Sequence, residues 1–531
     1  MNRFYGKIPL TIVLIMIMGL MLIQKSFSAQ NKSSRESCGK TGALCRRIVI
    51  LPLDGRNQTY DYIGRIVKIH GYEPIMPPRA IMGNINDYDQ SFKKNWDCWY
   101  WLNNNLDSRC AILILSADSL VYGGLLESRH SPMTILQALN QVNLLKIIRK
   151  KYPHIKILVF SSIPRREAEN RDRNFLVNAR LLEFVKSGVI DFLSISGDDV
   201  TDISRQVSEI AIMKKIIAEN KLEAKVLISD VDRIRLGIDE SAMVLFTRYI
   251  NSTKKKKPCV YIEYRDITSA RMKIDRYSAT PVMSVALDMV EAVGAEVVYQ
   301  PSLADLVLAV NHPSSGRSME DFTAKIKELR TDKPVALGDI SARTERAVFF
   351  KKIWRAGLFP GLAGYATWGM GTNALGTTLC EGFARLSCKD RQSYTEHTSF
   401  LYERLLTDYI YLCNIHLQLA EQTGIPAYSL SVMTPEQERE AVEKTVKALE
   451  QNLNELGIEL IPKKGNGNEK SAESDNIMSD NSFRFLVKLP ANPYATKAEI
   501  KAGPVVFPFH RLFEIDIPTK AELKITGKPG V

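Results

Sequence analysis

Short apolar runs alternate along the chain with stretches in which apolar residues recur every three or four positions. A continuous apolar run is typical of a strand buried on both faces, whereas the longer spacing predicts an amphipathic helix. Consecutive strand–helix–strand units imply parallel sheets with right-handed crossovers. The predicted strands are 46–54, 73–76, the first part of 110–124, 155–161, 190–196, 225–229, 259–264, 296–299, 306–310, 335–339 and 362–366.

Helices are predicted between these strands and after the last of them. They cover 60–70, 86–105, 135–151, 174–187, 204–219, 241–249, 282–293, 319–329, 344–356, 374–384, 396–423 and 435–456. From 463 to 481 the chain is polar and rich in Gly, Asn and Ser, which predicts a loop or a disordered insert. The tail, 483–525, alternates short apolar runs with turns and predicts a few strands.

This order of elements predicts an α/β protein with a parallel-sheet catalytic domain, barrel-like or doubly wound, and a second, smaller α/β domain. A helical region and a short β-rich C-terminal tail follow. The expected segments are an N-terminal segment (1–29), the first α/β domain with the acidic site (30–257), the second α/β domain (258–395), the helical region (396–462), the polar loop (463–482) and the β-rich tail (483–531). Two doubly wound domains fit the same spacing, but we favour a barrel-like domain followed by a doubly wound one.

The N-terminus has the pattern of a secretory signal peptide. A basic start precedes an apolar run, 8–23, and small residues such as Ser28 and Ala29 then offer a cleavage site. The run is short for a membrane-spanning helix, although an uncleaved anchor is the alternative. We therefore expect a secreted or extracytoplasmic protein, with membrane association through this segment as the second option.

Composition changes this picture little. The 531 residues are 45% hydrophobic and 24% charged, as in ordinary globular proteins, and the net charge of +12 favours contact with anionic surfaces such as wall polymers. The basic residues are scattered and no nucleic-acid-binding motif is present. The eight cysteines form no C-x-x-C pair, which argues against a thiolate zinc site, and an exported protein could pair them as disulfides.

Several predicted strands end in an acidic residue. Ligands of parallel sheets and barrels bind at the carboxyl ends of the strands, so these acids are expected to line one site. They are Asp54, Asp118, Asp198, Asp230 and Asp339.

The adjacent carboxylates Asp198 and Asp199 are the candidate catalytic pair. Glycosidases need a proton donor and a second group that stabilises positive charge at the anomeric carbon. Two carboxylates divide these roles when their environments separate their pKa values. In a substrate-assisted variant, one Asp orients the 2-acetamido group of the sugar and the other acts as the acid. The structural alternative is that Asp199 caps the next helix and only Asp198 faces the site.

Two further classes of function fit the same residues. Spread carboxylates suit Mg, Ca or Mn, so a divalent metal and hydrolysis of phosphate or acyl bonds form one alternative, although no compact metal motif such as H-E-x-x-H is present. The other alternative is a non-catalytic module that binds a glycan or the cell wall. The aromatic residues Trp96, Trp99, Tyr100 and Trp101 are either core residues or a sugar-stacking platform.

Five motifs, taken in order, are similar to those of a bacterial family called domain of unknown function 4127. They are Leu-Pro-Leu-Asp-Gly-Arg at 51–56, Ser-Ala-Asp-Ser-Leu-Val-Tyr-Gly-Gly-Leu-Leu-Glu-Ser-Arg at 116–129, Gly-Ile-Asp-Glu at 237–240, Gly-Tyr-Ala-Thr-Trp-Gly-Met-Gly-Thr-Asn-Ala-Leu-Gly at 364–376 and Phe-Pro-Phe-His-Arg-Leu-Phe-Glu at 507–514. The resemblance covers nearly the whole chain after the N-terminal segment, and the family name carries no activity. The acidic pair apart, it emphasises Asp54, Arg56, Asp118, Tyr122, Gly123, Gly124, Arg129, Asp239, Glu240, Asn311, Asp339, Tyr365, Trp368, Asn373, Arg511 and Glu514.

The leading expectation is an exported glycoside hydrolase-like enzyme that acts on an amino-sugar-containing glycan. Asp198 and Asp199 stand at the reacting bond, and no cofactor is required. The remaining expected substrate contacts divide by chemistry: Asp54 and Asp118 for sugar hydroxyls, Arg129 or Arg165 for an anionic substituent, Trp368 for ring stacking, and Arg56, Tyr122, Asp239, Glu240, Asn311, Asp339, Tyr365 and Asn373 as further contacts.

Overall fold

The computed structural model describes most of the chain after residue 46. The described residues are 47–83, 93–163, 170–198, 207–230, 236–271, 280–313, 316–427, 432–461, 481–490, 492–508, 510–512 and 515–524. Residues 46–531 form one compact unit. The predicted N-terminal signal or anchor (1–29), Arg165, Asp199, Glu514 and residues 463–480 of the polar loop lie outside the described residues. Within the described ranges, we find no helix with the length and apolar character needed to span a membrane.

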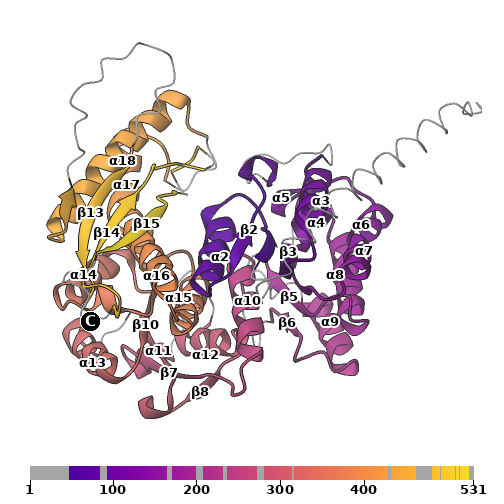
Figure 1. The fold of residues 1–531 in the computed structure, drawn as a ribbon, viewed down its shortest axis with the longest axis horizontal. Coiled ribbons are helices and arrows are strands. Elements are labelled where there is room, and N and C mark those ends of the chain that lie inside the picture. Colours follow the sequence, from indigo (N-terminus) through magenta and orange to yellow (C-terminus); the bar gives the residue numbers. More distant parts are fainter. Residues whose placement is uncertain are drawn as a thin grey trace, which may run out of the picture. The chain divides into compact units, whose positions relative to one another are not determined.

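Six parallel strands form the first sheet, which we call sheet A, in the order β2-β1-β3-β4-β5-β6 (Figure 1). The strands are β1 (Arg47–Leu51), β2 (Glu73–Ile75), β3 (Cys110–Ser116), β4 (Lys156–Ile163), β5 (Phe192–Gly197) and β6 (Val226–Ile228). The connecting helices are α2 (Asn57–Ile69), η1 (Arg79–Ile81), α3 (Lys93–Asn105), α4 (Ala117–Val121), α5 (Leu125–His130), α6 (Ile135–Val142), α7 (Leu144–Lys151), α8 (Arg171–Lys186), α9 (Val207–Glu219) and α10 (Ser241–Ser252).

Sheet A is an open, doubly wound sheet and not a barrel. In the described structure β2 and β6 are its two edges, and β1 lies inside the sheet with β2 on one side and β3 on the other. The barrel-like arrangement that we favoured is therefore wrong, and the doubly wound alternative holds. Strand spacing could not decide this, because both architectures repeat the same strand–helix unit.

Five parallel strands form sheet B in the order β11-β10-β9-β7-β8, which repeats the strand order of the first five strands of sheet A. The strands are β7 (Cys259–Tyr264), β8 (Glu296–Val298), β9 (Leu306–Asn311), β10 (Val335–Asp339) and β11 (Gly364–Ala366). Its helices are α11 (Ile267–Ala270), α12 (Val282–Ala292), η3 (Pro301–Leu303), α13 (Met319–Asp332), α14 (Arg343–Arg355), η4 (Phe359–Gly361) and α15 (Gly371–Leu386).

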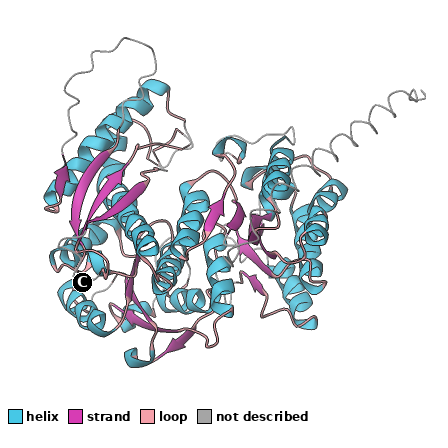
Figure 2. Ribbon diagram, viewed as in Figure 1, coloured by secondary structure: helices cyan, strands magenta, loops and turns pink. Residues whose placement is uncertain are grey.

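The two sheets bury one face each in a common hydrophobic cluster, which we call the central core. Successive side chains of a strand point to opposite faces, so alternate residues of each strand enter it. Ile48 and Ile50 of sheet A and Leu306 and Leu308 of sheet B belong to this core, together with apolar residues of α2, α10, α12 and α15. The other face of sheet A packs on α3, α6 and α8, and helices flank the strands throughout (Figure 2).

A helical region and a third, antiparallel sheet complete the fold. The helices are α16 (Arg391–Arg404), η5 (Leu405–Ile415), α17 (His416–Thr423) and α18 (Pro435–Glu455), and the sheet has the order β12-β13-β14-β15. Its strands are β12 (Glu459–Ile461), β13 (Phe483–Lys488), β14 (Lys497–Ala502) and β15 (Thr519–Lys524). The predicted helix 396–423 contains a π-helical segment, η5, which a period of 3.6 residues does not reveal.

Six cysteines lie in the described ranges, and all six are free thiols. They are Cys98, Cys110, Cys259, Cys380, Cys388 and Cys413. Five of the six are buried, as expected of cysteines that fall within apolar runs.

Candidate functional site

The carboxyl edge of sheet A is the candidate site, because the chain leaves β1 toward one side and β3 toward the other. A crevice forms at such a switch point, and ligands of doubly wound sheets bind there. The loops that follow β1 and β3 are joined at this point, since the Ser119 hydroxyl is within hydrogen-bonding distance of the carbonyl oxygens of Pro52 (2.6 Å) and Leu53 (2.8 Å). Asp54 and Asp118 therefore lie on the two sides of the switch point.

The loop after β1 holds a guanidinium between two carboxylates. Arg56 donates to both oxygens of the buried Asp54 (Nη2 to Oδ2, 2.8 Å) and, on its other side, to Asp239 (Nη2 to Oδ1, 2.7 Å). Thr59 also donates to Asp54 (2.6 Å), so this carboxylate is fully engaged. Asp54 thus fixes Arg56 and the start of α2.

Asp118 is buried at the end of β3 and accepts two hydrogen bonds from one residue of β4. The Ser162 amide donates to Oδ2 (2.9 Å) and its hydroxyl to Oδ1 (2.7 Å). Burial, together with the negative charge of nearby Asp198 and despite the bonds from Ser162, raises the pKa of Asp118 to about 6. A carboxyl group with that pKa holds a proton far more readily than an ordinary Asp.

Asp198 follows β5 and is locked in a bidentate ion pair. Arg129 at the end of α5 donates through Nε to Oδ2 (2.7 Å) and through Nη2 to Oδ1 (2.5 Å), and the side chain of Asp198 is almost fully buried. The Asp198 amide donates to the Ile163 carbonyl (3.1 Å), which brings Asp198 to the end of β4. Because Asp118 meets the same strand end from the other side, the two acids converge there.

Two glycines allow the loop after β3 to approach α3. Gly123 has φ of 105°, and a Cβ there would lie 2.8 Å from Cβ of Lys94. A side chain at Gly124 would collide with the Glu127 carboxylate. The loop then continues into α5, which carries Arg129.

Glu240 connects the first sheet to α15 of the second. Its Oε1 accepts from the Gly237 amide (2.7 Å) and its Oε2 from Nδ2 of Asn373 (2.6 Å). Burial, opposed by the hydrogen bond from Gly237, raises the pKa of Glu240 to about 7. Asn373 in turn accepts from the Met370 amide (2.8 Å), so Glu240 and Asn373 form a buried link between the two halves.

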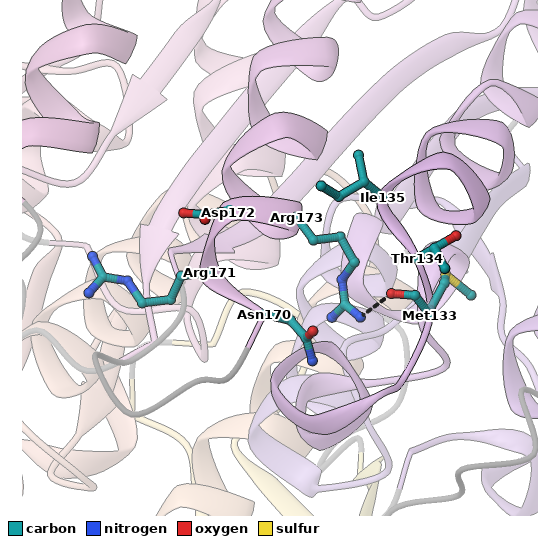
Figure 3. Close-up of a pocket in the computed structure, with 7 residues that line it drawn as sticks. All are labelled: Met133, Thr134, Ile135, Asn170, Arg171, Asp172 and Arg173. Atoms are coloured by element: carbon teal, nitrogen blue, oxygen red, sulfur yellow. Dashed lines mark hydrogen bonds between the residues drawn. The ribbon is translucent and has the colours of Figure 1, made fainter.

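A cavity of about 300 Å³ opens at the N-terminal ends of α6 and α8 (Figure 3). It is lined by Met133, Thr134, Ile135, Asn170, Arg171, Asp172 and Arg173. Asn170 donates to the Ser131 carbonyl (2.9 Å) and Arg173 to the Met133 carbonyl (3.0 Å), which fixes the wall of the cavity. Arg173 also lies over the ring of Tyr122, at 4.4 Å from its centroid. The cavity has the size of a small-ligand pocket.

The aromatic residues of α3 divide into two groups. Trp96 and Tyr100, four positions apart and so on one face of the helix, are 57% and 71% exposed. Trp99 and Trp101 pack instead against the core on the outer face of sheet A. Helix α3 lies against the loop after β3, because Asn95 donates to the Val121 carbonyl (3.0 Å). The exposed pair therefore belongs to a helix that packs on the end of α4, with its buried residues Asn95, Cys98 and Leu102 on the packed side.

The other predicted contacts lie at the carboxyl edge of sheet B or in the core. Asn311 ends β9 and donates to Asp339 at the end of β10 (2.9 Å), and Tyr365 is buried in β11. Trp368 packs edge-on against Tyr62 in the central core and donates to Thr377 (3.0 Å). These four residues thus lie apart from the carboxylates of sheet A.

Of the predicted site residues, sheet A brings together Asp54, Arg56, Asp118, Tyr122, Arg129, Asp198 and Asp239, with Glu240 and Asn373 adjoining. Sequence reasoning missed Ser162 and Arg173. Ser162 carried a signal, since it stands at a predicted strand end beside the acids, whereas nothing in the sequence marks Arg173 within its helix. The predicted residues Asp199 and Arg165 lie outside the described residues. In the described ranges, no three or more His, Cys, Asp or Glu side chains are placed to share a metal ion.

The fold and the site define an α/β protein of two doubly wound parallel sheets with an acidic edge on the first. The chain belongs to the family described as protein of unknown function (DUF4127), whose model matches residues 48–172 and 166–518. This match confirms the family that the five motifs indicated.

Comparisons with individual proteins add no activity. No curated protein matches the sequence. Two solved structures of the dinucleotide-forming acetyl-coenzyme A synthetase 1 of Ca. Korarchaeum cryptofilum, one with phosphate and ADP and one in the apo form, were found as similar. They cover 65% and 68% of this chain and 96% and 98% of their own, each at 8% identity and a TM-score of 0.20. A likeness at that TM-score carries no argument about this protein.

Proposed function

We propose that this protein is a glycoside hydrolase-like enzyme that acts on an amino-sugar-containing glycan at the carboxyl edge of sheet A. The observation that carries the proposal is the contrast between Asp118 and Asp198, which converge on the end of β4 in opposite environments. Asp118 is buried among neutral donors and its pKa is raised to about 6, whereas both oxygens of Asp198 accept from Arg129. Such a pair divides the roles of acid and charged carboxylate.

In the proposed reaction Asp118 is the general acid that protonates the leaving oxygen. Asp198, whose two oxygens accept from Arg129, stabilises the positive charge that develops at the anomeric carbon. The expectation from the sequence gave both roles to Asp198 and Asp199. Asp199 remains in the proposal as the group that orients the 2-acetamido substituent, and Arg129 now acts through Asp198 and is a positioning residue.

Two features favour a glycan as the substrate. The cavity at the N-terminal ends of α6 and α8 combines apolar side chains, Met133 and Ile135, with the polar Thr134 and Asn170, which suits the mixed faces of a sugar ring. It adjoins the helix that carries Arg129, because Asn170 donates to the Arg129 carbonyl (3.4 Å). On α3, Trp96 and Tyr100 offer exposed aromatic surface on which further sugar units could stack. The predicted export segment, 1–29, is consistent with a substrate outside the cytoplasm.

The test is the release of aryl alcohol from aryl N-acetylhexosaminides by the purified full-length chain. Asp118→Asn and Asp198→Asn should each lower kcat by about 100-fold or more, the usual contribution of a positioned acid or base. Asp199→Asn should show a loss of similar size. Wild-type activity should also fall as the pH rises above about 6, because Asp118 then loses its proton.

Asp230→Asn is the matched control. Asp230 also follows a strand of sheet A, β6, but it pairs with Lys214 and lies outside the acid pair. Its substitution should leave kcat within twofold of wild type. Wild-type rates in both Asp118→Asn and Asp198→Asn, or no hydrolysis of any aryl N-acetylhexosaminide by the wild type, would overturn the proposal.

A further inference from the structure

Sheet B has a switch point of its own, between β7 and β9. Strand β7 lies inside the sheet with β8 on one side and β9 on the other, as β1 does in sheet A. The first residue after β7 is Arg265, and its amide donates to the Val310 carbonyl of β9 (3.0 Å). Arg265 therefore stands at the position where doubly wound sheets bind ligands.

Arg265 is only 6% exposed, yet its guanidinium is incompletely paired. Nε donates to the Arg317 carbonyl (3.1 Å). Nη1 is buried and has no hydrogen-bond partner among the described residues. A buried charge without a counter-charge is strongly disfavoured, so an arrangement of this kind calls for an anion.

The acids closest in sequence and space to Arg265 are engaged elsewhere. Glu263 pairs with Arg317 (2.7 Å). Asp266 accepts from the amides of Thr268 and Ser269 at the start of α11. Glu320, whose pKa Arg265 helps to lower, forms an ion pair with Lys352. The contacts among the described residues thus leave the buried Nη1 of Arg265 without an acceptor, a role that a bound anion would fill.

His312, the residue after β9, forms a neutral wall beside Arg265. Its Nδ1 donates to the Pro313 carbonyl (2.9 Å), and its Nε2 accepts from the Asp266 amide (3.5 Å). These two contacts fix the neutral tautomer that carries its proton on Nδ1. Burial lowers the pKa of His312, which also favours the neutral ring. The ring neither supplies a counter-charge to Arg265 nor repels an incoming anion.

Farther along the same edge lie acceptor oxygens that lack donors. Oδ1 of Asn311 and Oδ2 of Asp339 are buried, and neither has a hydrogen-bond partner in the part of the chain that the structure describes. Their other polar atoms are held in place, because Nδ2 of Asn311 donates to Oδ1 of Asp339. Strand β9 adjoins β7 and β10 is the next strand beyond it, so Asn311 and Asp339 lie roughly 5 Å and roughly 10 Å from the end of β7.

We propose that the carboxyl edge of sheet B binds a small hydroxylated oxyanion, with its phosphate or carboxylate on Nη1 of Arg265 and its hydroxyl groups on Asn311 and Asp339. The free cationic donor selects the anionic end, and the two free acceptors select hydroxyl donors. This site is on a different sheet from the proposed hydrolase site, and the inference does not rest on that function.

Isothermal titration calorimetry on the full-length chain tests the inference with four probes: glucose 6-phosphate, gluconate, inorganic phosphate and glucose. We expect one molecule of glucose 6-phosphate or gluconate per chain, and the stronger of the two identifies the anionic group. Inorganic phosphate should bind at least tenfold more weakly than the preferred probe, and glucose should not bind. Absence of binding by both hydroxylated anions at millimolar concentration would overturn the proposal.

Arg265→Gln should lower the affinity for the preferred probe by at least tenfold. Arg248→Gln is the control, because the Arg248 guanidinium is also partly buried but donates to the Glu291 carbonyl at the end of α12. The affinity of this variant for the preferred probe should stay within twofold of wild type. Asp339→Asn provides a second variant if Arg265→Gln does not fold. Asp339→Asn should reduce the ratio of the affinity for the preferred hydroxylated probe to the affinity for inorganic phosphate. An unchanged ratio in Asp339→Asn, or an unchanged affinity for the preferred probe in Arg265→Gln, contradicts the site.

Discussion

At the scale of single residues, the partner of each acid decides what the acid can do. Asp54 and Asp198 each face a guanidinium, whereas Asp118 and Glu240 are buried among neutral donors. The first two each have a cationic partner, and burial raises the pKa of the second two to about 6 and about 7. Residues of one chemical type thus acquire different roles at one edge of a sheet.

The raised pKa of Asp118 predicts a pH-dependent contribution to stability. An unfolded Asp titrates near 3.9, so between about pH 4 and pH 6 the unfolded state loses this proton first. The contribution of Asp118 to the free energy of unfolding therefore falls as the pH rises through that window, by about 3 kcal/mol in total. Asp118→Asn lacks this contribution.

Urea unfolding of wild type and Asp118→Asn at pH 4 and at pH 7 measures it. The free energy of unfolding of the wild type relative to the variant should decrease by about 2 kcal/mol between the two pH values, because at pH 4 the unfolded Asp is already about half ionised. Other titrating groups, such as the buried His70 and His397, cancel because both proteins contain them. A difference that does not vary with pH would contradict the raised pKa.

At the scale of elements, the sequence predicts the strands well and their side-chain partners poorly. The predicted strand 335–339 coincides with β10, and β3 occupies the first part of 110–124 as predicted, because a buried strand needs a continuous apolar run whatever its neighbours. The acidic edge follows from those strand ends. That Asp54 pairs with Arg56, or that the free guanidinium belongs to Arg265, depends on which loops meet in space. The openness of sheet A depends on strand pairing, which local periodicity does not contain.

For the aromatic residues of α3, the sequence left two interpretations, core residues or a sugar-stacking platform, and the burial of each side chain distinguishes them. Its exposed pair predicts a role in binding extended glycans under the proposed function. The double variant Trp96→Ala, Tyr100→Ala should raise KM for a chitooligosaccharide about tenfold and leave kcat unchanged, since each aromatic contact contributes about 0.5–1.5 kcal/mol. Leu136→Ala, which removes an exposed side chain of α6, should leave KM unchanged. Equal KM values for the double variant and wild type would exclude the stacking role.

At the scale of the whole molecule, the central core makes the two sheets depend on each other. Helices α2, α10, α12 and α15 bury apolar residues together with one face of each sheet. The C-terminal part adds polar contacts to α2, since Asn57 donates to the Ile515 carbonyl (2.6 Å) and Arg65 pairs with Glu403 (2.8 Å). A substitution at the junction of the halves should therefore affect the stability of the whole chain.

Asn373→Ala tests that dependence. It removes the donor to Glu240 and the acceptor of the Met370 amide, and leaving buried polar groups unpaired costs about 1–3 kcal/mol. We expect a loss of that size in the free energy of unfolding, measured with urea. Asn105→Ala, which removes only a bond within its own helix to the Trp101 carbonyl, should cost less than about 0.5 kcal/mol. Equal losses in the two variants would contradict the link.

The guanidinium of Arg56 between two carboxylates has an electrostatic consequence. One cation against Asp54 and Asp239 gives the loop after β1 a local excess of negative charge, although the chain as a whole carries +12. A polymeric substrate of the proposed function would therefore meet two potentials of opposite sign. We expect the net positive charge to attract polyanions at long range, and the negative charge of the loop after β1 to disfavour anionic units at the carboxyl edge of sheet A relative to neutral or cationic ones. Under that proposal, the electrostatic potential alone would favour some units of a mixed polymer over others before direct contact.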